Sequence, residues 1–162
     1  MADKKTRVAV VSDKAGYPLK KAVVEYLQGR DDIEVMDLGQ DSPDVAIPYP
    51  EQAPKVARAV QDGSADRGVA ICGTGQGMAI VANKFKGVYA VVADTVFAGD
   101  RGRIINNANV ITMGGWITAP VLGVKIVESW LALDFTQTME DRAEWLSAAF
   151  KTVQGIEEEN FS

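Results

Sequence analysis

The chain contains no histidine among its 162 residues. This absence excludes, within the chain, any mechanism that needs an imidazole as acid, base or metal ligand, and any zinc site of the cysteine–histidine type. Cysteine is almost absent too, because Cys72 is the only one. A single cysteine rules out an intrachain disulfide framework and is typical of a reducing compartment, so we expect a cytoplasmic protein.

Excess basic charge and long apolar runs are also lacking. The net charge is −5 and the sequence pI is about 4.8, which argues against a surface that binds nucleic acid. No apolar run approaches the ~20 residues that a membrane span needs. The charged segment 1–7 leads directly into an apolar strand, so we expect no signal peptide. We therefore expect neither nucleic acid nor a membrane as a partner.

The residues that are present favour one α/β domain over residues 1–162. Apolar residues make up 47% of the chain, enough to fill a core. Apolar runs alternate with helical periodicity, which predicts a doubly wound, mostly parallel five-stranded sheet with helices on both faces. We expect strands at 8–11, 33–39, 68–71, 88–93 and 110–113, and helices near 18–27, 53–60, 78–82, 96–105 and 121–133. A C-terminal helix at 138–158 could lie on the domain or pack on a partner subunit.

Cys72 ends the third predicted strand and opens a loop containing Gly73, Gly75 and Gly77, after which a helix follows. Ligands bind at this end of the strands in α/β folds, and glycines let backbone N–H groups cradle an oxyanion. A thiol facing such a cradle is favoured in its thiolate form. The alternative is a buried, inert cysteine beside a tight turn. The loop lacks the Gly-Lys-Ser/Thr of a P-loop and the spacing of a dinucleotide fingerprint.

Other strand ends bring further polar groups to the same edge. Asp13 and Lys14 follow the first strand, and Asp94 follows the fourth. A thiolate base, backbone amides and the Thr74 hydroxyl would suit proton abstraction next to a carbonyl. The structural alternatives are that Asp13 only shapes a turn and that Asp94 is the N-cap of the next helix.

A group of asparagines and arginines surrounds the start of the fifth strand. Asn106, Asn107 and Asn109 could approach a site in a neighbouring subunit or merely build a turn. Arg101 and Arg103 are expected on a solvated helix face unless the pocket recruits them.

Several segments together form a recognisable pattern. They are SDKAG at 12–16, YP at 49–50, ADRG at 65–68, ICGTGQGM at 71–78 followed by ANK at 82–84, and NNANV at 106–110. Over about residues 8–135 the chain resembles the ribose-5-phosphate isomerase B and galactose-6-phosphate isomerase family. The C-terminal helix matches poorly.

The resemblance implies a Rossmann-like subunit, a homodimer with sites at the subunit interface, and aldose–ketose interconversion of a sugar phosphate through a cis-enediolate without metal or other cofactor. It implies that Cys72 is the base moving a proton between C1 and C2. It also implies that the oxyanion cradle consists of Gly73, Thr74, Gly75 and Gly77, and that Asp13, Tyr49 and Asn106 bind substrate. Trp116, Trp130 and Trp145 offer surface for the dimer interface.

The departures from the family pattern concern histidine and arginine. Lys14 and Ile105 stand where the family commonly has histidine, and the second of these histidines opens the sugar ring. Trp116 stands at a usual arginine, and a usual arginine pair falls at Met139 and Ala143, so Arg142 is the nearest cation there. Lys14, Arg103 and Arg142 could supply replacement charge, although a lysine cannot copy a bidentate arginine.

Two classes of function follow. The first is an isomerase of the ribose 5-phosphate type or, alternatively, of a tetrose 4-phosphate, which cannot close a furanose ring and needs no ring-opening histidine. In the pentose case, Asp94 or water could assist ring opening. The second is a non-catalytic sugar-phosphate-binding subunit that a partner chain completes. A redox-sensing thiol is disfavoured because the chain has no resolving cysteine.

Overall fold

The computed structural model describes residues 4–161 and has one five-stranded sheet in the order β2-β1-β3-β5-β4. All neighbouring strands are parallel. The strands are β1 (Thr6–Ser12), β2 (Ile33–Asp37), β3 (Arg67–Cys72), β4 (Ala90–Val92) and β5 (Val110–Gly114). The helices are α1 (Tyr17–Gln28), α2 (Tyr49–Gln61), α3 (Gln76–Ala82), α4 (Val96–Asn106), α5 (Pro120–Leu131) and α6 (Ala143–Asn160), with a short 3-10 turn, η1 (Glu140–Arg142). The predicted α/β class is confirmed.

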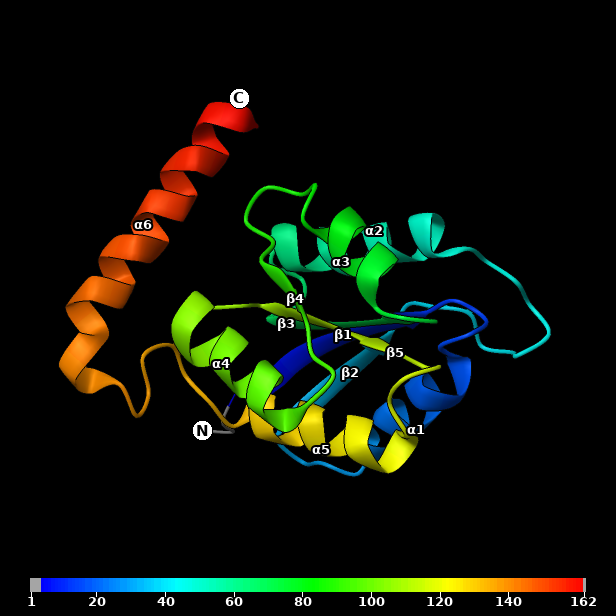
Figure 1. The fold of residues 1–162 in the computed structure, drawn as a ribbon. Helices are drawn as coiled ribbons and strands as arrows, with labels where there is room; N and C mark the ends of the chain where they lie inside the picture. The colour runs from blue at the N-terminus through cyan, green and yellow to red at the C-terminus, as the bar shows by residue number, and fades with distance from the viewer. Residues whose placement is uncertain (1–3, 162) are drawn as a thin grey trace.

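The helices cover both faces of the sheet, as Figure 1 shows. Helices α1, α4 and α5 pack on one face, and α2 and α3 pack on the other. Each face has its own apolar core, because side chains along a strand alternate between the faces. In β1, for example, Val8 and Val10 join the first core while Ala9 and Val11 join the second.

The strand order reverses between β1 and β3, because β2 is added on one side of β1 and β3 on the other. The chain leaves β1 for α1 on one face and leaves β3 for α3 on the opposite face. The two strand ends are held together, since the backbone N–H of Asp13 donates to the carbonyl of Ile71 at 3.1 Å. Helices that diverge in this way leave a crevice at the carboxyl ends of the strands, where α/β proteins bind ligands.

The structure corrects the expected N-cap of α4. The cap is Thr95, whose Oγ1 accepts a hydrogen bond from the Ala98 N–H at 3.0 Å. Asp94 is therefore not the N-cap, and its Oδ1 is buried without a hydrogen-bond partner among residues 4–161. Threonine has the extended backbone and the short oxygen that the position requires.

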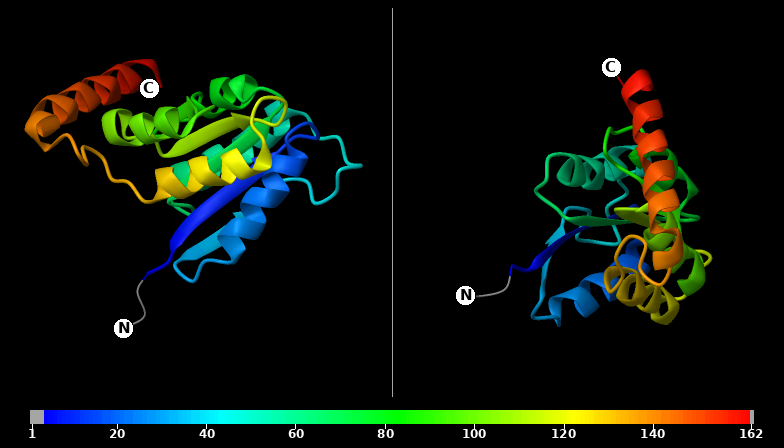
Figure 2. Two further views of the ribbon diagram at one scale, coloured as in Figure 1. Left: turned by 60° about the horizontal axis from the view of Figure 1, so that its bottom comes forward. Right: turned by 90° about the vertical axis from the view of Figure 1, so that its left-hand side faces the viewer.

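Helix α6 stands apart from the two helix layers (Figure 2). It is joined to the start of β4 through Glu157, which accepts from the Gly87 N–H at 2.7 Å and from the Tyr89 hydroxyl at 2.8 Å. The Phe150 ring packs edge-on against Tyr89. Among the described residues, no helix is long and apolar enough to cross a membrane.

Candidate active site

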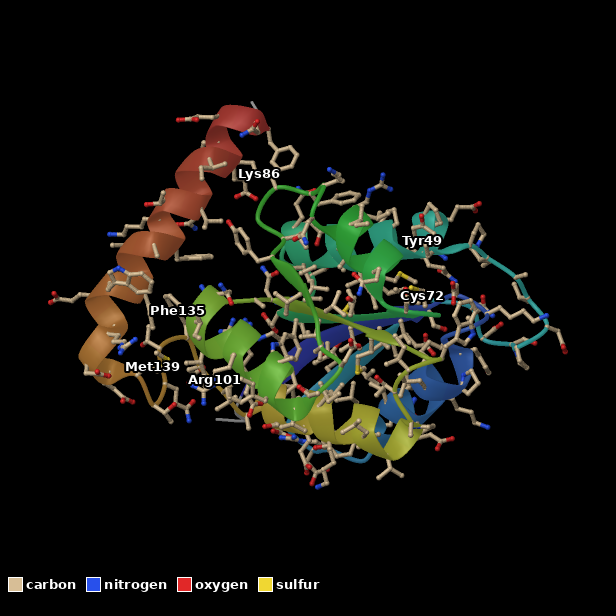
Figure 3. The ribbon with its side chains drawn as sticks, in the orientation of Figure 1. Tyr49, Cys72, Lys86, Arg101, Phe135 and Met139 are labelled. Carbon is tan, nitrogen blue, oxygen red and sulfur yellow. The ribbon has the colours of Figure 1, made fainter. Side chains whose placement is uncertain are left out.

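The candidate site is the crevice at the carboxyl ends of β1, β3 and β5. It has a volume of about 380 Å³ and is lined by Asp13, Ala15, Tyr49, Cys72, Gly73, Thr74, Gly77, Ile80 and Trp116. Figure 3 shows Cys72 and Tyr49 close to each other at this end of the molecule. Six of these residues were singled out from the sequence for chemistry or substrate contact: Asp13, Tyr49, Cys72, Gly73, Thr74 and Gly77.

Cys72 lies at the base of the crevice and is only 5% exposed. Its Sγ accepts a hydrogen bond from the backbone N–H of Gly75 at 3.1 Å. Gly75 adopts φ +80, a left-handed conformation that glycine reaches without the penalty of a Cβ, and this turn brings the N–H back to the sulfur. The sulfur therefore accepts a hydrogen bond from a backbone amide of the loop, and Cys72, although it belongs to a buried core cluster, is one of the residues that line the crevice.

Two aromatic rings lie directly on the other glycines of the loop. A Cβ built on Gly73 would stand 2.7 Å from the Trp116 ring, and one on Gly77 would stand 2.7 Å from the Tyr49 ring. Any side chain at either glycine would displace a ring. Gly73 and Gly77 are thus needed for close approach, and Trp116 and Tyr49 form the walls of the crevice.

Asp13 and Thr74 are each engaged in local turns. The Asp13 Oδ1 accepts from the Gly16 N–H at 3.0 Å, so the turn interpretation of Asp13 holds. Asp13 also lines the crevice, so both interpretations describe it. The Thr74 Oγ1 accepts from the Gln76 N–H at 3.4 Å, a long contact that leaves the hydroxyl proton free to donate.

Lys14 directly follows Asp13, one of the residues that line the crevice. It is exposed and lines an adjoining hollow together with Asp13, Ala15, Ala46, Ile47 and Pro48. No lysine or arginine lines the crevice itself within the part of the chain that the structure describes. Its walls are aromatic and apolar, and Asp13 is the only carboxylate among its lining residues in 4–161.

The remaining predicted site residues lie elsewhere in the same subunit. Asp94 follows β4 outside the crevice, and Asn106 lines an apolar cavity beneath α6. Arg142 is exposed on η1, and its closest carboxylate contact is Asp141 at 3.9 Å. Figure 3 places Met139, just before η1, on the opposite side of the molecule from Cys72.

Two surface expectations are wrong. Arg103, expected on a solvated helix face, is only 7% exposed, because it folds under α4 to reach the carbonyls of Leu133 and Ala108. Trp130, expected to offer interface surface, is fully buried between α5 and the sheet. Trp116 and Trp145 are exposed, as expected.

Sequence reasoning missed Ile80 as a crevice residue, and it noted Trp116 only at the position of a usual arginine and as interface surface. Trp116 follows the glycine pair 114–115 at the end of β5, and a Cβ on Gly115 would stand 2.3 Å from the Ala15 carbonyl. A glycine pair after a buried strand indicates that another backbone segment approaches closely, so this pair could have predicted the contact between the end of β5 and the turn after β1.

The crevice has the parts needed to move a proton on a carbonyl compound. A sulfur that can serve as base lies beside backbone donors and a hydroxyl that can stabilise a developing oxyanion. Among residues 4–161, no group of three or more histidine, cysteine, aspartate or glutamate side chains is placed to hold a metal ion.

Comparison with known proteins identifies relatives over nearly the whole chain. The profile of the ribose/galactose isomerase family matches residues 8–146. A protein of Clostridium sp. strain MSTE9 named 4-deoxy-4-sulfo-D-erythrose isomerase is 45% identical over 94% of this chain and 96% of its own length. A D-erythrulose-4-phosphate isomerase of Pectobacterium atrosepticum is 37% identical over 79% of this chain and 84% of its own.

The fold has solved counterparts as well. The structure of ribose-5-phosphate isomerase B from Clostridium thermocellum superposes with a TM-score of 0.87 at 32% identity, covering 97% of this chain and all of that one. The predicted family and the Rossmann-like α/β fold are thereby confirmed. The chain belongs to the ribose/galactose isomerase family and is an aldose–ketose isomerase.

Proposed function

We propose that the enzyme interconverts a four-carbon aldose that carries an anionic group on C4 with the corresponding ketose, and that this group is a sulfonate. The substrate pair would then be 4-deoxy-4-sulfo-erythrose and 4-deoxy-4-sulfo-erythrulose. The observation that carries the proposal is the complete absence of histidine, with Ile105 at the position of the ring-opening histidine. The Clostridium relative, 45% identical, supports the same substrate class.

Ring chemistry explains why the missing histidine points to four carbons. A furanose closes when the C4 hydroxyl of an aldose attacks C1, and a sugar with a phosphate or sulfonate at C4 has no such hydroxyl. Its carbonyl is therefore open or hydrated, and no group is needed to open a ring. A pentose 5-phosphate keeps its C4 hydroxyl and needs ring opening, for which this chain has no imidazole.

The charge of the crevice favours a sulfonate over a phosphate. A phosphate ester carries about −1.5 to −2 charge at neutral pH, whereas a sulfonate carries a single delocalised charge. The crevice is walled by Trp116 and Tyr49 and has no cation among its described lining residues. Lys14 at the adjoining hollow is a point charge that suits a monoanion.

In the proposed reaction, the Cys72 thiolate removes the C2 proton of the aldose. The carbonyl oxygen O1 becomes an enediolate oxygen held by the backbone N–H groups of the glycine loop. The sulfur returns the proton to C1, while the Thr74 hydroxyl relays the hydroxyl proton from O2 to O1. Supporting this assignment, Cys72 and Thr74 line the same crevice and Gly75 N–H points at the sulfur.

We further propose that the enzyme is a homodimer whose sites use both subunits. Asn106 and Arg142 lie away from Cys72 in their own subunit, so they could contact substrate only in a partner's crevice. Large apolar side chains are exposed in the crevice and at, or just before, the starts of α4 and α5, which favours burial against another subunit. They are Ile80, Phe97, Trp116, Ile117, Val121 and Leu122.

The test is a parallel assay of purified enzyme on 4-deoxy-4-sulfo-erythrose, erythrulose 4-phosphate and ribose 5-phosphate. We expect the highest kcat/KM on the sulfonate and the lowest on ribose 5-phosphate. A higher value on ribose 5-phosphate than on both four-carbon sugars would overturn the proposal. Solvent-proton exchange at C1 or C2 by the isolated chain tests the alternative of a non-catalytic binding subunit, which predicts no exchange.

A further inference from the structure

A second polar cavity lies at the amino-terminal end of β3, the opposite end of the strand from Cys72. Its volume is about 370 Å³, and its lining includes Arg67, Arg103, Asn107 and Gln154. Arg67 is the first residue of β3, and Arg103 comes from the last turns of α4. Two guanidinium groups from different elements therefore share one hollow.

Neither guanidinium has a carboxylate partner. Arg103 donates to neutral acceptors only: the Leu133 carbonyl at 3.3 Å, the Asn107 Oδ1 at 2.8 Å and the Ala108 carbonyl at 3.1 Å. Arg67 donates to the Asp66 carbonyl at 2.9 Å. Within residues 4–161, no carboxylate oxygen lies within 4.0 Å of either group. Both groups keep unused N–H donors.

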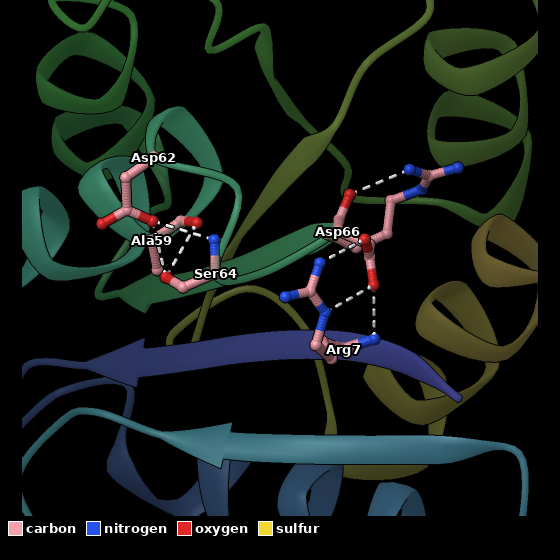
Figure 4. Close-up of polar contacts among 6 residues, drawn as sticks. Arg7, Ala59, Asp62, Ser64 and Asp66 are labelled. Carbon is pink, nitrogen blue, oxygen red and sulfur yellow. Dashed lines mark hydrogen bonds and ion pairs between the residues drawn. The ribbon is translucent and has the colours of Figure 1, made fainter. Parts of the chain in front are cut away.

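The carboxylates around the cavity either bind other groups or lie too far from Arg67 and Arg103 to form an ion pair. Asp66 lines the cavity, but its carboxylate accepts from the Arg7 backbone N–H, Nε and Nη2 at 2.8, 3.1 and 2.8 Å, as Figure 4 shows. Glu157 is bound to Gly87 and Tyr89. Burial lowers the pKa of Arg67, and the charges of Asp134 and Asp66 only partly oppose that shift. Among the described residues, neither carboxylate forms an ion pair with Arg67 or Arg103.

The arginine pair is electrostatically costly without a ligand. Burial, followed by the charge of Arg67, lowers the pKa of Arg103 to about 10. A buried charge is normally paired, and a planar guanidinium fork matches the oxygens of a tetrahedral anion. An anion between the two groups would remove their repulsion and use the free donors.

We propose that Arg67 and Arg103 form a binding site for a compact tetrahedral oxyanion, separate from the catalytic crevice. The shared ligand chemistry is a sulfur or phosphorus oxyanion, supplied either as free sulfate or phosphate or as the anionic group of an organic sulfonate or phosphate ester. The lone pairs of the Asn107 Oδ1 are turned toward Arg103, which orients that guanidinium for the ligand.

The test is calorimetric titration of the intact protein with sodium sulfate, sodium phosphate and methanesulfonate, with sodium chloride at matched ionic strength as the reference. Arg67→Gln is the main variant, because Arg67 has fewer structural contacts than Arg103. Arg58→Gln is the matched control, since Arg58 lies on α2 with its guanidinium over the Phe85 ring. Lys14→Gln reports binding at the hollow that adjoins the catalytic crevice.

We expect Arg67→Gln to weaken sulfate and phosphate binding about tenfold, the effect of one lost charge-assisted contact, while Arg58→Gln binds like the wild type. Equal binding of methanesulfonate would assign the site to organic sulfonates, and preference for the inorganic ions would assign it to free anions. The proposal is overturned if Arg67→Gln binds as the wild type does, if Lys14→Gln alone removes binding, or if chloride acts equally.

Discussion

At the scale of single residues, the proposed chemistry depends on one sulfur atom. Cys72 is held at the end of β3, in hydrogen-bond contact with the Gly75 N–H and beside the Trp116 and Tyr49 rings that wall the crevice. The surrounding backbone is shaped by glycines whose missing side chains let these rings and amides approach. The local sequence therefore specifies both the proposed base and the space around it.

Cys72→Ala should lower kcat by about 10²–10⁴-fold, because a lost general base typically costs that much. The fold should persist, since alanine is smaller than cysteine and the position tolerates a small side chain. Steady-state kinetics with circular dichroism as the folding control measure both effects. Unchanged turnover in a folded variant would remove Cys72 from the mechanism.

A second residue-scale prediction concerns the preference for sulfonate over phosphate. Trp116→Arg places a cation on the crevice wall, where the ring now lies over Gly73. The ratio of kcat/KM for erythrulose 4-phosphate to that for the sulfonate sugar should rise at least about tenfold, because a charge-assisted contact favours the more highly charged anion. Trp116→Phe, which keeps a neutral ring, should leave the ratio nearly unchanged.

At the scale of elements, the loop between β2 and α2 leads directly to Tyr49, which lines the crevice. Lys20 of α1 is 2% exposed, and its Nζ donates to the Asp37 carboxylate at 2.9 and 3.1 Å and to the Gln40 carbonyl. Gln40 in turn bridges the loop, donating to the Ser42 carbonyl and accepting from the Ile47 N–H. The ordered loop then delivers Tyr49 to the crevice.

Lys20→Met should release this loop. The loss of charged hydrogen bonds should lower the free energy of unfolding by about 1–3 kcal/mol and raise KM more than it lowers kcat. Denaturant unfolding and hydrogen exchange of residues 38–48 measure the two consequences. Lys21→Met is the control, because Lys21 is exposed on the same helix; if it behaves like Lys20→Met, the loop is not held by Lys20.

At the scale of the whole molecule, stability at low pH depends on the contact between β1 and β3. The Arg7 guanidinium and backbone N–H lower the pKa of Asp66 to about 2, whereas an unfolded aspartate titrates near 3.9. Between those values the unfolded chain binds a proton that the folded chain does not. The free energy of unfolding should therefore fall as the pH falls from about 4 to 2.

Asp66→Asn removes this titration. The variant should be less stable than the wild type at neutral pH and should lose less of its stability between pH 4 and pH 2, as followed by tryptophan fluorescence during urea unfolding. Other carboxylates with a lowered pKa, among them Asp32 and Asp62, leave some slope in the variant. An identical slope in both proteins would show that Asp66 titrates normally when folded.

The proposed homodimer makes a prediction about mixed subunits. Cys72→Ala and Asn106→Ala should each be weakly active alone, since each removes a residue from both sites. If the sites combine Cys72 of one subunit with Asn106 of the other, unfolding and refolding an equal mixture should restore about one quarter of wild-type activity. No recovery, despite mixed dimers in native mass spectrometry, would place both residues in one subunit's site or outside it.

The sequence by itself determined the architecture and the position of Cys72. The periodicities of apolar residues, interrupted by glycines and prolines, specified alternating strands and helices and hence a parallel sheet. The order of these segments placed Cys72 and Asp13 at the same edge of that sheet. These features are local or follow from connectivity, which is why residue order and periodicity are enough to predict them. The absence of histidine likewise narrowed the chemistry through composition alone.

Only the tertiary structure decided which distant side chains meet. It placed the Trp116 and Tyr49 rings on two glycines of one loop, buried Trp130, gave the N-cap of α4 to Thr95 and joined Arg67 to Arg103 in one cavity. Each of these outcomes depends on how separate elements pack, and neither residue type nor periodicity encodes that geometry directly. The side-chain surroundings of the site are therefore a property of the packed molecule rather than of any one segment.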